Sequence, residues 1–440
     1  MSRFLFRLSW VLLLVAPQAA AAWLGMCAPE PGQAGVRVLE IVLKPAGTAV
    51  ALVASDEPLR DCAMTEIALA KERIQWTKVI TRVAAHELAG GVILKGVDRD
   101  GRFAANEVIP LKDKARATVS HPHGAESVSP GPIRATPHRA LWIWRPEAWQ
   151  AQPDKLFALL AAYAADSVFV TIPVTADRTR VAEPGALEHF VKQASGRGVR
   201  VWAVAGDARA VLPAERARYA ERASAYAEYN RSVVAEARLA GLQLDIEPYL
   251  NPGYDIDTEG WLSAYLDTLA QVRAQAEMPL DVALPYWWGA QAYRGGLFLD
   301  HLAPLVDVVT VMNYRTNRQQ ILDFAEPFLA WAARSRRNVR IGLETGPIPD
   351  ESMRVFRSSR DGELWLLPLG EYALVLLLDA PLTPSAGGAF AYSHTTRWRG
   401  SSITFRDNLS ALREMLPLLE TEWRGWKSFS GVALHGLDIP

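Results

Sequence analysis

From residue 138 to the C-terminus, short apolar runs alternate with longer segments in which apolar residues recur at helical spacing. The apolar runs predict eight strands, at residues 140–144, 167–172, 199–204, 241–247, 280–285, 306–312, 339–344 and 431–435. The helical patterns occupy residues 154–165, 184–196, 213–240, 259–276, 317–335 and 405–419. Fully apolar strands that alternate with helices are typical of a parallel sheet covered on its outside. Eight of them fit a closed barrel better than an open sheet, so the pattern predicts an α/β fold with a (β/α)8 TIM-type barrel at 138–440.

Residues 23–120 follow a different pattern, in which strand-like runs such as 36–43 and 48–53 are separated by turn residues. We therefore predict an N-terminal β-rich accessory domain. Residues 121–137 are rich in Pro, Gly, Ser and His without a hydrophobic period, which is typical of a linker.

Between the seventh and eighth predicted strands lies an insertion at about residues 348–404 that contains further strand-like runs. It follows the carboxyl end of a strand, where barrels place their binding loops, so it could form a wall of the active-site cleft. His394 and Trp398 of the insertion could then reach the cleft. The chain ends just after the eighth strand, and we expect the accessory domain to cover the side of the barrel where an eighth outer helix would lie.

The first 22 residues have the features of a secretory signal peptide. Arg3 and Arg7 precede the apolar run from Leu8 to Ala16, and small residues follow at 19–22. We expect this segment to be removed and the protein to be exported, to the periplasm or the medium. No later segment reaches the roughly 20 apolar residues of a membrane helix, so no membrane span is expected after removal.

Composition narrows the possible partners. A formal net charge of −1 argues against nucleic acid, because phosphate binding needs a basic surface. The sequence contains no nucleotide-binding, metal-binding or serine-nucleophile motif, so we expect neither a cofactor nor a metal. Cys27 and Cys62 are the two cysteines, and in an oxidising compartment they are expected to form a disulfide, the alternative being two buried thiols.

The strongest chemical signal is the segment 241–249, which reads Gly-Leu-Gln-Leu-Asp-Ile-Glu-Pro-Tyr. Side chains alternate along a strand, so Gln243, Asp245 and Glu247 share the inward face, and the last two lie where the strand enters the barrel mouth. Burial and a like-charge neighbour would both raise the pKa of one carboxyl, as a general acid at neutral pH requires. The structural alternative is a polar cluster that plugs the top of the barrel.

This segment resembles the strand-4 signature D-G-x-D-x-D-x-E of the family 18 glycoside hydrolases, the chitinase group. Residues 311–314 resemble the Met-x-Tyr segment of its strand 6, residues 339–343 its strand 7, and residues 431–435 its last strand. The resemblance covers roughly residues 138–440. The sequence departs from it where Ala240 and Gln243 replace two aspartates and where His435 replaces a tryptophan.

The resemblance implies a glycoside hydrolase that cleaves a polysaccharide or oligosaccharide. Glu247 would be the general acid, while Asp245 and Tyr314 would orient a 2-acetamido group whose own carbonyl acts as the nucleophile. A second interpretation uses Glu344 at the end of the seventh strand. A glutamate on strand 4 and another on strand 7 resembles the layout of many retaining barrel glycosidases, with Glu344 as nucleophile.

A third interpretation is a catalytically silent, chitinase-like protein that binds glycans, since the two replaced aspartates would tune the acid. The 15 tryptophans of the chain suit sugar binding, because an aromatic ring offers a flat apolar face to a sugar. The candidate substrate-binding residues are Trp142, Trp144, Gln243, Tyr249, Tyr286, Trp287, Trp288, Asn313 and His435.

Overall fold

The computed structural model describes residues 22–27, 35–60, 62–67, 69, 73–99, 102–111 and 138–437. Residues 1–21 of the predicted signal peptide and the predicted linker at 121–137 lie outside the described residues. No helix of the described ranges combines the length and apolar character needed to cross a membrane.

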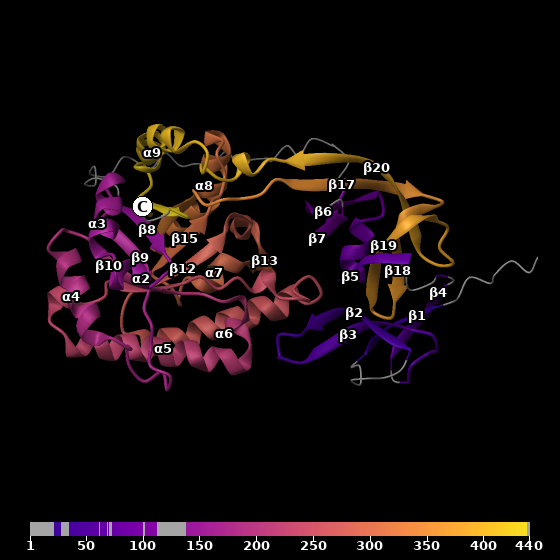
Figure 1. The fold of residues 1–440 in the computed structure, drawn as a ribbon, viewed down its shortest axis with the longest axis horizontal. Helices are drawn as coiled ribbons and strands as arrows, with labels where there is room; N and C mark the ends of the chain where they lie inside the picture. The colour runs from indigo at the N-terminus through magenta and orange to yellow at the C-terminus, as the bar shows by residue number, and fades with distance from the viewer. Residues whose placement is uncertain are drawn as a thin grey trace, which may run out of the picture.

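Residues 138–437 contain a closed barrel of eight parallel strands (Figure 1). In chain order the strands are β8 (Arg139–Ile143), β9 (Ser167–Thr171), β10 (Arg200–Ala205), β11 (Gly241–Leu244), β12 (Leu280–Pro285), β15 (Val308–Met312), β16 (Asn338–Glu344) and β21 (Phe429–His435). The last strand pairs with the first in parallel, with Val432 opposite Arg139. The predicted barrel is therefore confirmed, and each predicted strand overlaps an observed one.

Helices cover the outside of the barrel (Figure 1). They are α2 (Glu147–Gln150), α3 (Pro153–Ala162), α4 (Pro184–Ser195), α5 (Pro213–Ser232), α6 (Thr258–Ala276), α7 (Phe298–Leu302), α8 (Arg318–Ser335) and α9 (Leu409–Trp423). The helix predicted at 213–240 ends at Ser232 instead. Its last turns are replaced because the Asn230 side chain bonds both the N–H and the carbonyl of Leu239, which holds the chain in a non-helical return to β11.

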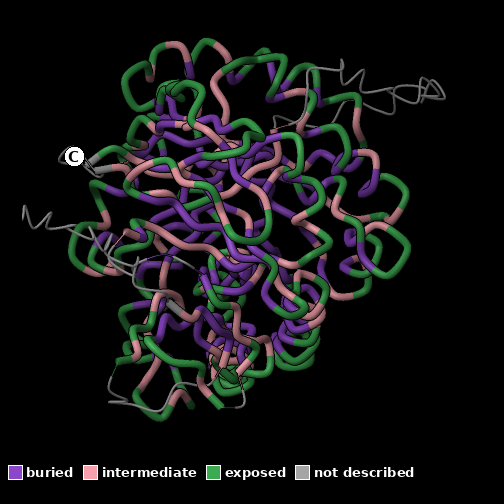
Figure 2. Tube along the Cα trace, turned by 90° about the vertical axis from the view of Figure 1, so that its right-hand side faces the viewer, coloured by how far each residue is buried: buried purple, intermediate pink, exposed green. Residues whose placement is uncertain are grey.

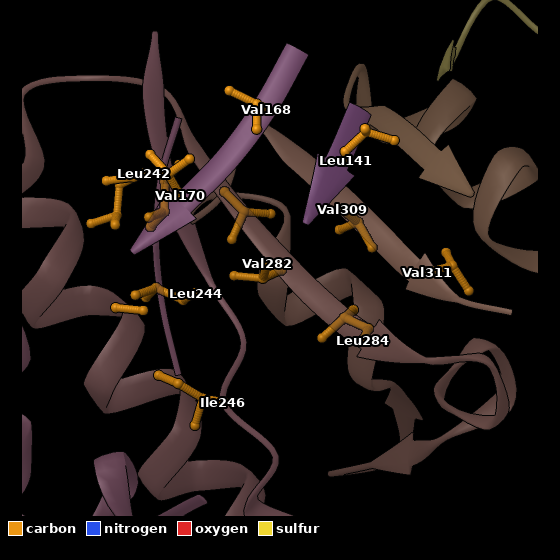
Figure 3. Close-up of a cluster of buried hydrophobic side chains, with 14 of the residues drawn as sticks. Leu141, Val168, Val170, Leu242, Leu244, Ile246, Val282, Leu284, Val309 and Val311 are labelled. Atoms are coloured by element: carbon orange, nitrogen blue, oxygen red, sulfur yellow. The ribbon is translucent and has the colours of Figure 1, made fainter. Parts of the chain in front are cut away.

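Alternation along the strands sorts the barrel side chains into two sets. One set packs outward against the helices, and Figure 3 shows members of it such as Leu141, Val170, Leu244 and Val311. This layer is the main core of the molecule, and buried residues run through the interior while exposed residues cover the outside (Figure 2). The other set faces the barrel axis and includes Trp142, Phe169 and Trp202.

A polar network also crosses the inside of the barrel. Arg340 of β16 and Asp281 of β12 form a buried ion pair, and the hydroxyl of Thr310 donates to Asp281 Oδ2 at 2.8 Å. The amide of Gln243 donates to the same oxygen at 2.9 Å, and its carbonyl accepts the indole N–H of Trp142. Gln243 is fully buried and engaged at both ends, so it belongs to the barrel interior and not to the substrate-binding residues among which we predicted it.

The gap in the ring of outer helices is closed by α9 and α3, and not by the accessory domain as expected. Arg139 donates through Nε and Nη2 to the buried carboxylate of Glu420 in α9, and through Nη1 to the carbonyl of Tyr163 at the end of α3. The guanidinium of Arg413 lies 5.2 Å from the centre of the Tyr163 ring. These contacts draw the two helices together across the junction of β21 and β8.

The accessory region contains two antiparallel sheets in its described residues. The first has the order β2-β3-β1-β4, from β1 (Ala22–Cys27), β2 (Val36–Leu43), β3 (Ala49–Ser55) and β4 (Ala63–Ile67). A disulfide joins Cys27 at the end of β1 to Cys62 just before β4. The two positions are 35 apart in the sequence, and closing a loop of this length stabilises a fold by about 3–4 kcal/mol in the chain-entropy model.

The second sheet combines strands from both ends of the chain. Its order is β5-β19-β18-β20-β17-β6-β7, with β5 (Ile74–Thr81), β6 (Gly91–Arg99) and β7 (Arg102–Pro110) from the N-terminal region and β17 (Glu351–Ser359), β18 (Gly362–Leu369), β19 (Tyr372–Leu382) and β20 (Gly388–Trp398) from the insertion. The helix α1 (Arg82–Glu87) connects β5 to β6. The insertion therefore reaches away from the barrel along most of its length and completes the accessory domain (Figure 1), where we had expected it to wall the cleft. Its last strand returns toward the barrel, and the Trp398 ring lies 5.9 Å from the guanidinium of Arg315, the residue after Tyr314.

The loop that follows β11 is seated on this composite domain. The carbonyl of Pro252 accepts the backbone N–H of Leu43 at 2.9 Å, and Asp255 forms an ion pair with Lys78 at 3.2 Å. Ile256 is buried in the hydrophobic core of the accessory sheets. Gly253 has φ +94°, and a side chain there would collide with the Leu43 carbonyl 2.6 Å away. The segment that leaves Asp245 and Glu247 is thus fixed at its far end.

Candidate active site

The carboxyl ends of the barrel strands, which we call the rim, bring together residues that are far apart in the sequence. Asp245 and Glu247 follow β11, Tyr314 follows β15, Glu344 ends β16 and His435 ends β21. All five come from strands whose carboxyl ends point the same way, because the strands are parallel. The rim therefore carries three carboxyl groups, one imidazole and one phenol.

Asp245 is the first of the rim carboxyls along the chain. Its backbone N–H donates to the Ala205 carbonyl of β10 at 2.9 Å, which holds the residue against the neighbouring strand. Its Oδ1 atom is buried and has no hydrogen-bond partner among the described residues. Burial and the nearby Glu247 charge raise the pKa of Asp245 to about 7, against a smaller opposing effect of His435. Asp245 therefore combines a raised pKa with an oxygen that can accept a further hydrogen bond.

Glu247 lies nearer to solvent and is held by an aromatic partner. The hydroxyl of Tyr249 donates to Glu247 Oε2, and the short 3-10 helix η4 (Pro248–Leu250) sets the position of that tyrosine. Burial raises the pKa of Glu247, while the Tyr249 hydrogen bond and the charge of His435 act in the opposite direction. A carboxyl with a raised pKa keeps its proton closer to neutral pH, as a general acid must.

Tyr314 directs its phenol toward the rim carboxyls. Its ring stacks on His435, with centroids 6.0 Å apart and planes inclined by 18°. Burial and the charges of Asp245, Glu344 and Glu247 raise the pKa of Tyr314 well above its ordinary value of 10.0, so the hydroxyl remains a donor. The adjacent Asn313 does not face the rim, because it is fully buried and its amide donates to the Ile321 carbonyl at 2.7 Å.

Both carboxylate oxygens of Glu344 are already occupied. Oε1 accepts the backbone N–H groups of Thr345 and Gly346 at 2.9 and 2.5 Å, and Oε2 lies 2.7 Å from His435 Nδ1. Burial opposes ionisation of this residue, but the His435 contact and the two N–H groups outweigh burial and lower the pKa of Glu344. With only 3% of its surface exposed, Glu344 is an anchor for His435.

His435 connects this anchor to the open side of the rim. Its Nε2 accepts the indole N–H of Trp144 at 2.9 Å, so Nδ1 carries the proton that Glu344 accepts. Burial lowers the pKa of His435, but the hydrogen bond and charge of Glu344 and the charges of Asp245 and Glu247 raise it above its ordinary value. Protonation at Nε2 would break the bond to Trp144, which is 36% exposed.

The predicted aromatic residues divide into exposed and buried groups. Trp287 is 48% exposed, and its ring contacts those of Tyr249 and Tyr286, each 5.2 Å away. Trp288 is fully buried between Tyr265 and Phe298, and Trp142 is 3% exposed inside the barrel. Trp144, Tyr249, Tyr286 and Trp287 can therefore meet a ligand at the rim, whereas Trp142 and Trp288 support the structure beneath it.

Sequence reasoning missed two features of the site. Asp281 and Arg340 form the polar floor under Asp245, and neither belongs to a recognisable motif. Arg315 directly follows Tyr314 and donates to the Tyr286 hydroxyl at 2.6 Å. Its place after the strand-6 motif was the signal that could have identified it.

The fold and the rim define a (β/α)8-barrel protein with paired acidic residues at the end of its fourth strand. Residues 241–249 and 311–314 lie at the ends of barrel strands four and six, the positions that their resemblance to family 18 glycoside hydrolases implies.

No family model and no curated protein matches the chain. Similar solved structures include the spore cortex-lytic enzyme SleL of Bacillus cereus, with 12% identity and a TM-score of 0.37 over 70% of this chain and 73% of that chain. A chitinase of Chromobacterium violaceum has 12% identity and a TM-score of 0.36 over 69% and 95% of the two chains. A group IV chitinase of Ostrinia furnacalis has 12% identity and a TM-score of 0.37 over 68% and 91%. We base the proposed function on the side chains of the rim.

Replacing Glu344 tests its role as the anchor of His435. In Glu344→Gln the pKa of His435 should fall, because burial then acts without the compensating carboxylate. Titration of the His435 ring by NMR measures the change, and the exposed Glu236→Gln serves as the matched control. An unchanged His435 titration in Glu344→Gln would show that Glu344 does not hold this ring.

Proposed function

We propose that this protein is a glycoside hydrolase that cleaves a glycan containing 2-acetamido sugars, with Glu247 as the general acid. The observation that supports it best is Asp245, whose buried Oδ1 has no partner in the described ranges, while Glu247 and the Tyr314 hydroxyl lie at the same rim. A buried oxygen without a partner costs free energy, and the N–H of an acetamido group would satisfy it. A glycan ligand also agrees with the exposed aromatic rings of the rim.

The first step breaks the glycosidic bond. Glu247 gives its proton to the glycosidic oxygen, and the departing sugar leaves with that proton. The acetamido carbonyl oxygen attacks the anomeric carbon, while Asp245 accepts the N–H of the group and Tyr314 donates to its oxygen. This is the substrate-assisted route, in which the substrate supplies the nucleophile.

The second step restores the enzyme. Water attacks the anomeric carbon and opens the cyclic intermediate, and the Glu247 carboxylate takes a proton from that water. The product keeps the anomeric configuration of the substrate because two displacements occur at the same carbon. The raised pKa of Glu247 suits both roles, since the group must hold its proton before the first step and regain it in the second.

The route through Glu344 as nucleophile has less support. Its two oxygens accept hydrogen bonds from His435 and from two backbone N–H groups, and those bonds stabilise the charge that a nucleophile would have to share with the sugar. The silent glycan-binding alternative is supported by the sequence, because Ala240 and Gln243 occupy the positions of two aspartates in the family motif. The measurement below separates it from a hydrolase.

Glu247→Gln should lower hydrolysis by about 10²–10⁴-fold, because the amide cannot donate a proton to the leaving group. Products are measured by mass spectrometry from a panel of N-acetylated polysaccharides and their de-N-acetylated counterparts. The wild type and the control Glu236→Gln should release oligosaccharides from an N-acetylated member and not from its counterpart. Equal turnover by Glu247→Gln would contradict the assignment, and tight binding without any turnover by the wild type would favour the silent alternative.

Tyr249→Phe should move the alkaline limb of the pH–rate profile to higher pH. The Tyr249 hydroxyl stabilises the ionised form of Glu247, so its removal raises the pKa of the acid and keeps it protonated further into the alkaline range. The profile of kcat/KM against pH measures this. Tyr254→Phe is the matched control, because the Tyr254 ring packs edge-on against Tyr249 but no hydrogen bond joins its hydroxyl to Glu247 in the described part of the chain. A limb that stays in place, or moves to lower pH, would contradict the role of Tyr249.

We also propose that the protein is exported, on the support of the signal-like residues 1–22 and of the Cys27–Cys62 disulfide, which is typical of an oxidising compartment. The mature chain should begin at Trp23. Intact-mass measurement of the protein recovered from the periplasm and the medium of an expressing bacterium tests this. A full-length chain retained in the cytoplasm would count against export.

A further inference from the structure

Arg315 lies at the edge of the rim without an acidic partner. Two of its five guanidinium N–H groups are used, one by the Tyr314 carbonyl and one by the Tyr286 hydroxyl, each at 2.6 Å. The residue is half-buried, and among the described residues no Asp or Glu lies within ion-pair distance of it. The remaining N–H groups therefore have no acceptor in the described chain.

Two other arginines that line the barrel are each balanced by a carboxylate. Arg139 is paired with Glu420, and Arg340 is paired with Asp281. A positive charge that is partly removed from water without such a partner costs free energy. Of these three arginines, Arg315 is therefore the one whose charge a bound anion would stabilise.

Aromatic rings hold the Arg315 guanidinium in place. It lies 4.6 Å from the centre of the Tyr286 ring, 5.5 Å from Phe324 and 5.9 Å from Trp398, the last residue of β20. Contacts of this kind restrict the movement of the guanidinium. The N–H groups that have no acceptor among the described residues are therefore held beside these rings, where a bound anion could accept them.

The position of Arg315 relative to Glu247 follows from ring contacts. The Tyr286 ring lies 5.2 Å from Trp287, the Trp287 ring lies 5.2 Å from Tyr249, and the Tyr249 hydroxyl bonds Glu247. Trp287 and Trp398 are 48% and 40% exposed, so each offers a face on which a sugar ring can stack. A sugar unit beside the one that contacts Glu247 would lie next to Arg315.

We propose that Arg315 binds a carboxylate carried by the glycan, on a unit next to the bond that is cleaved, and that the substrate class is therefore an acidic polysaccharide. This inference rests on the proposed function for the place of the cleaved bond. A guanidinium pairs with a carboxylate through two parallel N–H···O bonds, which fixes the orientation of the sugar as well as adding affinity. Glu247 and Asp245 then contact the sugar unit that reacts, and Arg315 contacts the neighbouring sugar unit.

Binding is measured by calorimetry in the Glu247→Gln background, so that turnover does not affect it. The probes are hyaluronan hexasaccharide, an oligogalacturonate and an oligomannuronate, each beside its carboxyl-reduced form. At least one acidic probe should bind about tenfold more tightly than its reduced form, as expected for a charge-assisted pair. Arg315→Gln removes the positive charge and leaves a shorter side chain with one NH2 group, so it should abolish that preference. Arg334→Gln, an exposed arginine near the C-terminal end of α8, should retain it.

The inference is overturned if no acidic probe is preferred or bound, or if Arg315→Gln keeps the preference while its near-ultraviolet circular dichroism is unchanged. Arg315 would then only support Tyr286 and Trp398. Failure of the proposed function gives a different result, namely a preference for acidic probes in a wild type that hydrolyses no glycan. Hydrolysis of a neutral N-acetylated glycan with no acidic preference would keep the hydrolase and remove this inference.

Discussion

Closure of the parallel barrel is the constraint on which the rest of the structure depends. Because the eight strands of residues 138–437 run the same way, every strand delivers its carboxyl end to one rim. Asp245, Glu247 and Glu344 are thereby gathered beside one another, although about 100 residues separate the first from the last. Burial at the rim raises the pKa of Asp245 and Glu247. The low dielectric of the same buried site also strengthens each hydrogen bond at Glu344. The chemistry proposed for the rim follows from this gathering.

The inside of the barrel shows how the protein manages charge below the rim. The family motif would place a carboxylate at position 243, and this chain has an amide there that bonds Asp281 and Trp142. The buried carboxylate inside the barrel is that of Asp281, and Arg340 balances its charge. Asp245 consequently has a neutral neighbour directly beneath it on its own strand, and its raised pKa comes mainly from burial and from Glu247. The buried Asp281–Arg340 ion pair is weak evidence for stability, but removal of either partner would leave an unpaired charge inside the barrel.

The accessory domain shares a chain segment with the barrel and is not an appended module. Strands β5, β6 and β7 complete their sheet only with the four strands of the insertion, which leaves and re-enters the barrel next to Glu344. The loop after Glu247 is held by Leu43 and by the core around Ile256. The domain therefore touches the rim segments on both the strand-4 and strand-7 sides, and Trp398 brings its sheet to Arg315. A movement of this domain would therefore displace the rim segments that it contacts.

The sequence by itself determined the barrel, its strands and the acidic pair, because alternation along a strand and helical spacing are local properties that survive in any context. Only the tertiary structure decided how the ends of those strands meet. Pairing of residues 351–398 with 74–110 joins segments far apart in the chain, and no local pattern specifies a partner strand. Residues from other strands also decide the surroundings of single side chains. They fill both oxygens of Glu344 and bury Gln243, and in the described part of the chain they bring no carboxylate to Arg315. A sequence position reveals what a side chain can do, and the neighbours supplied by the fold decide what it does.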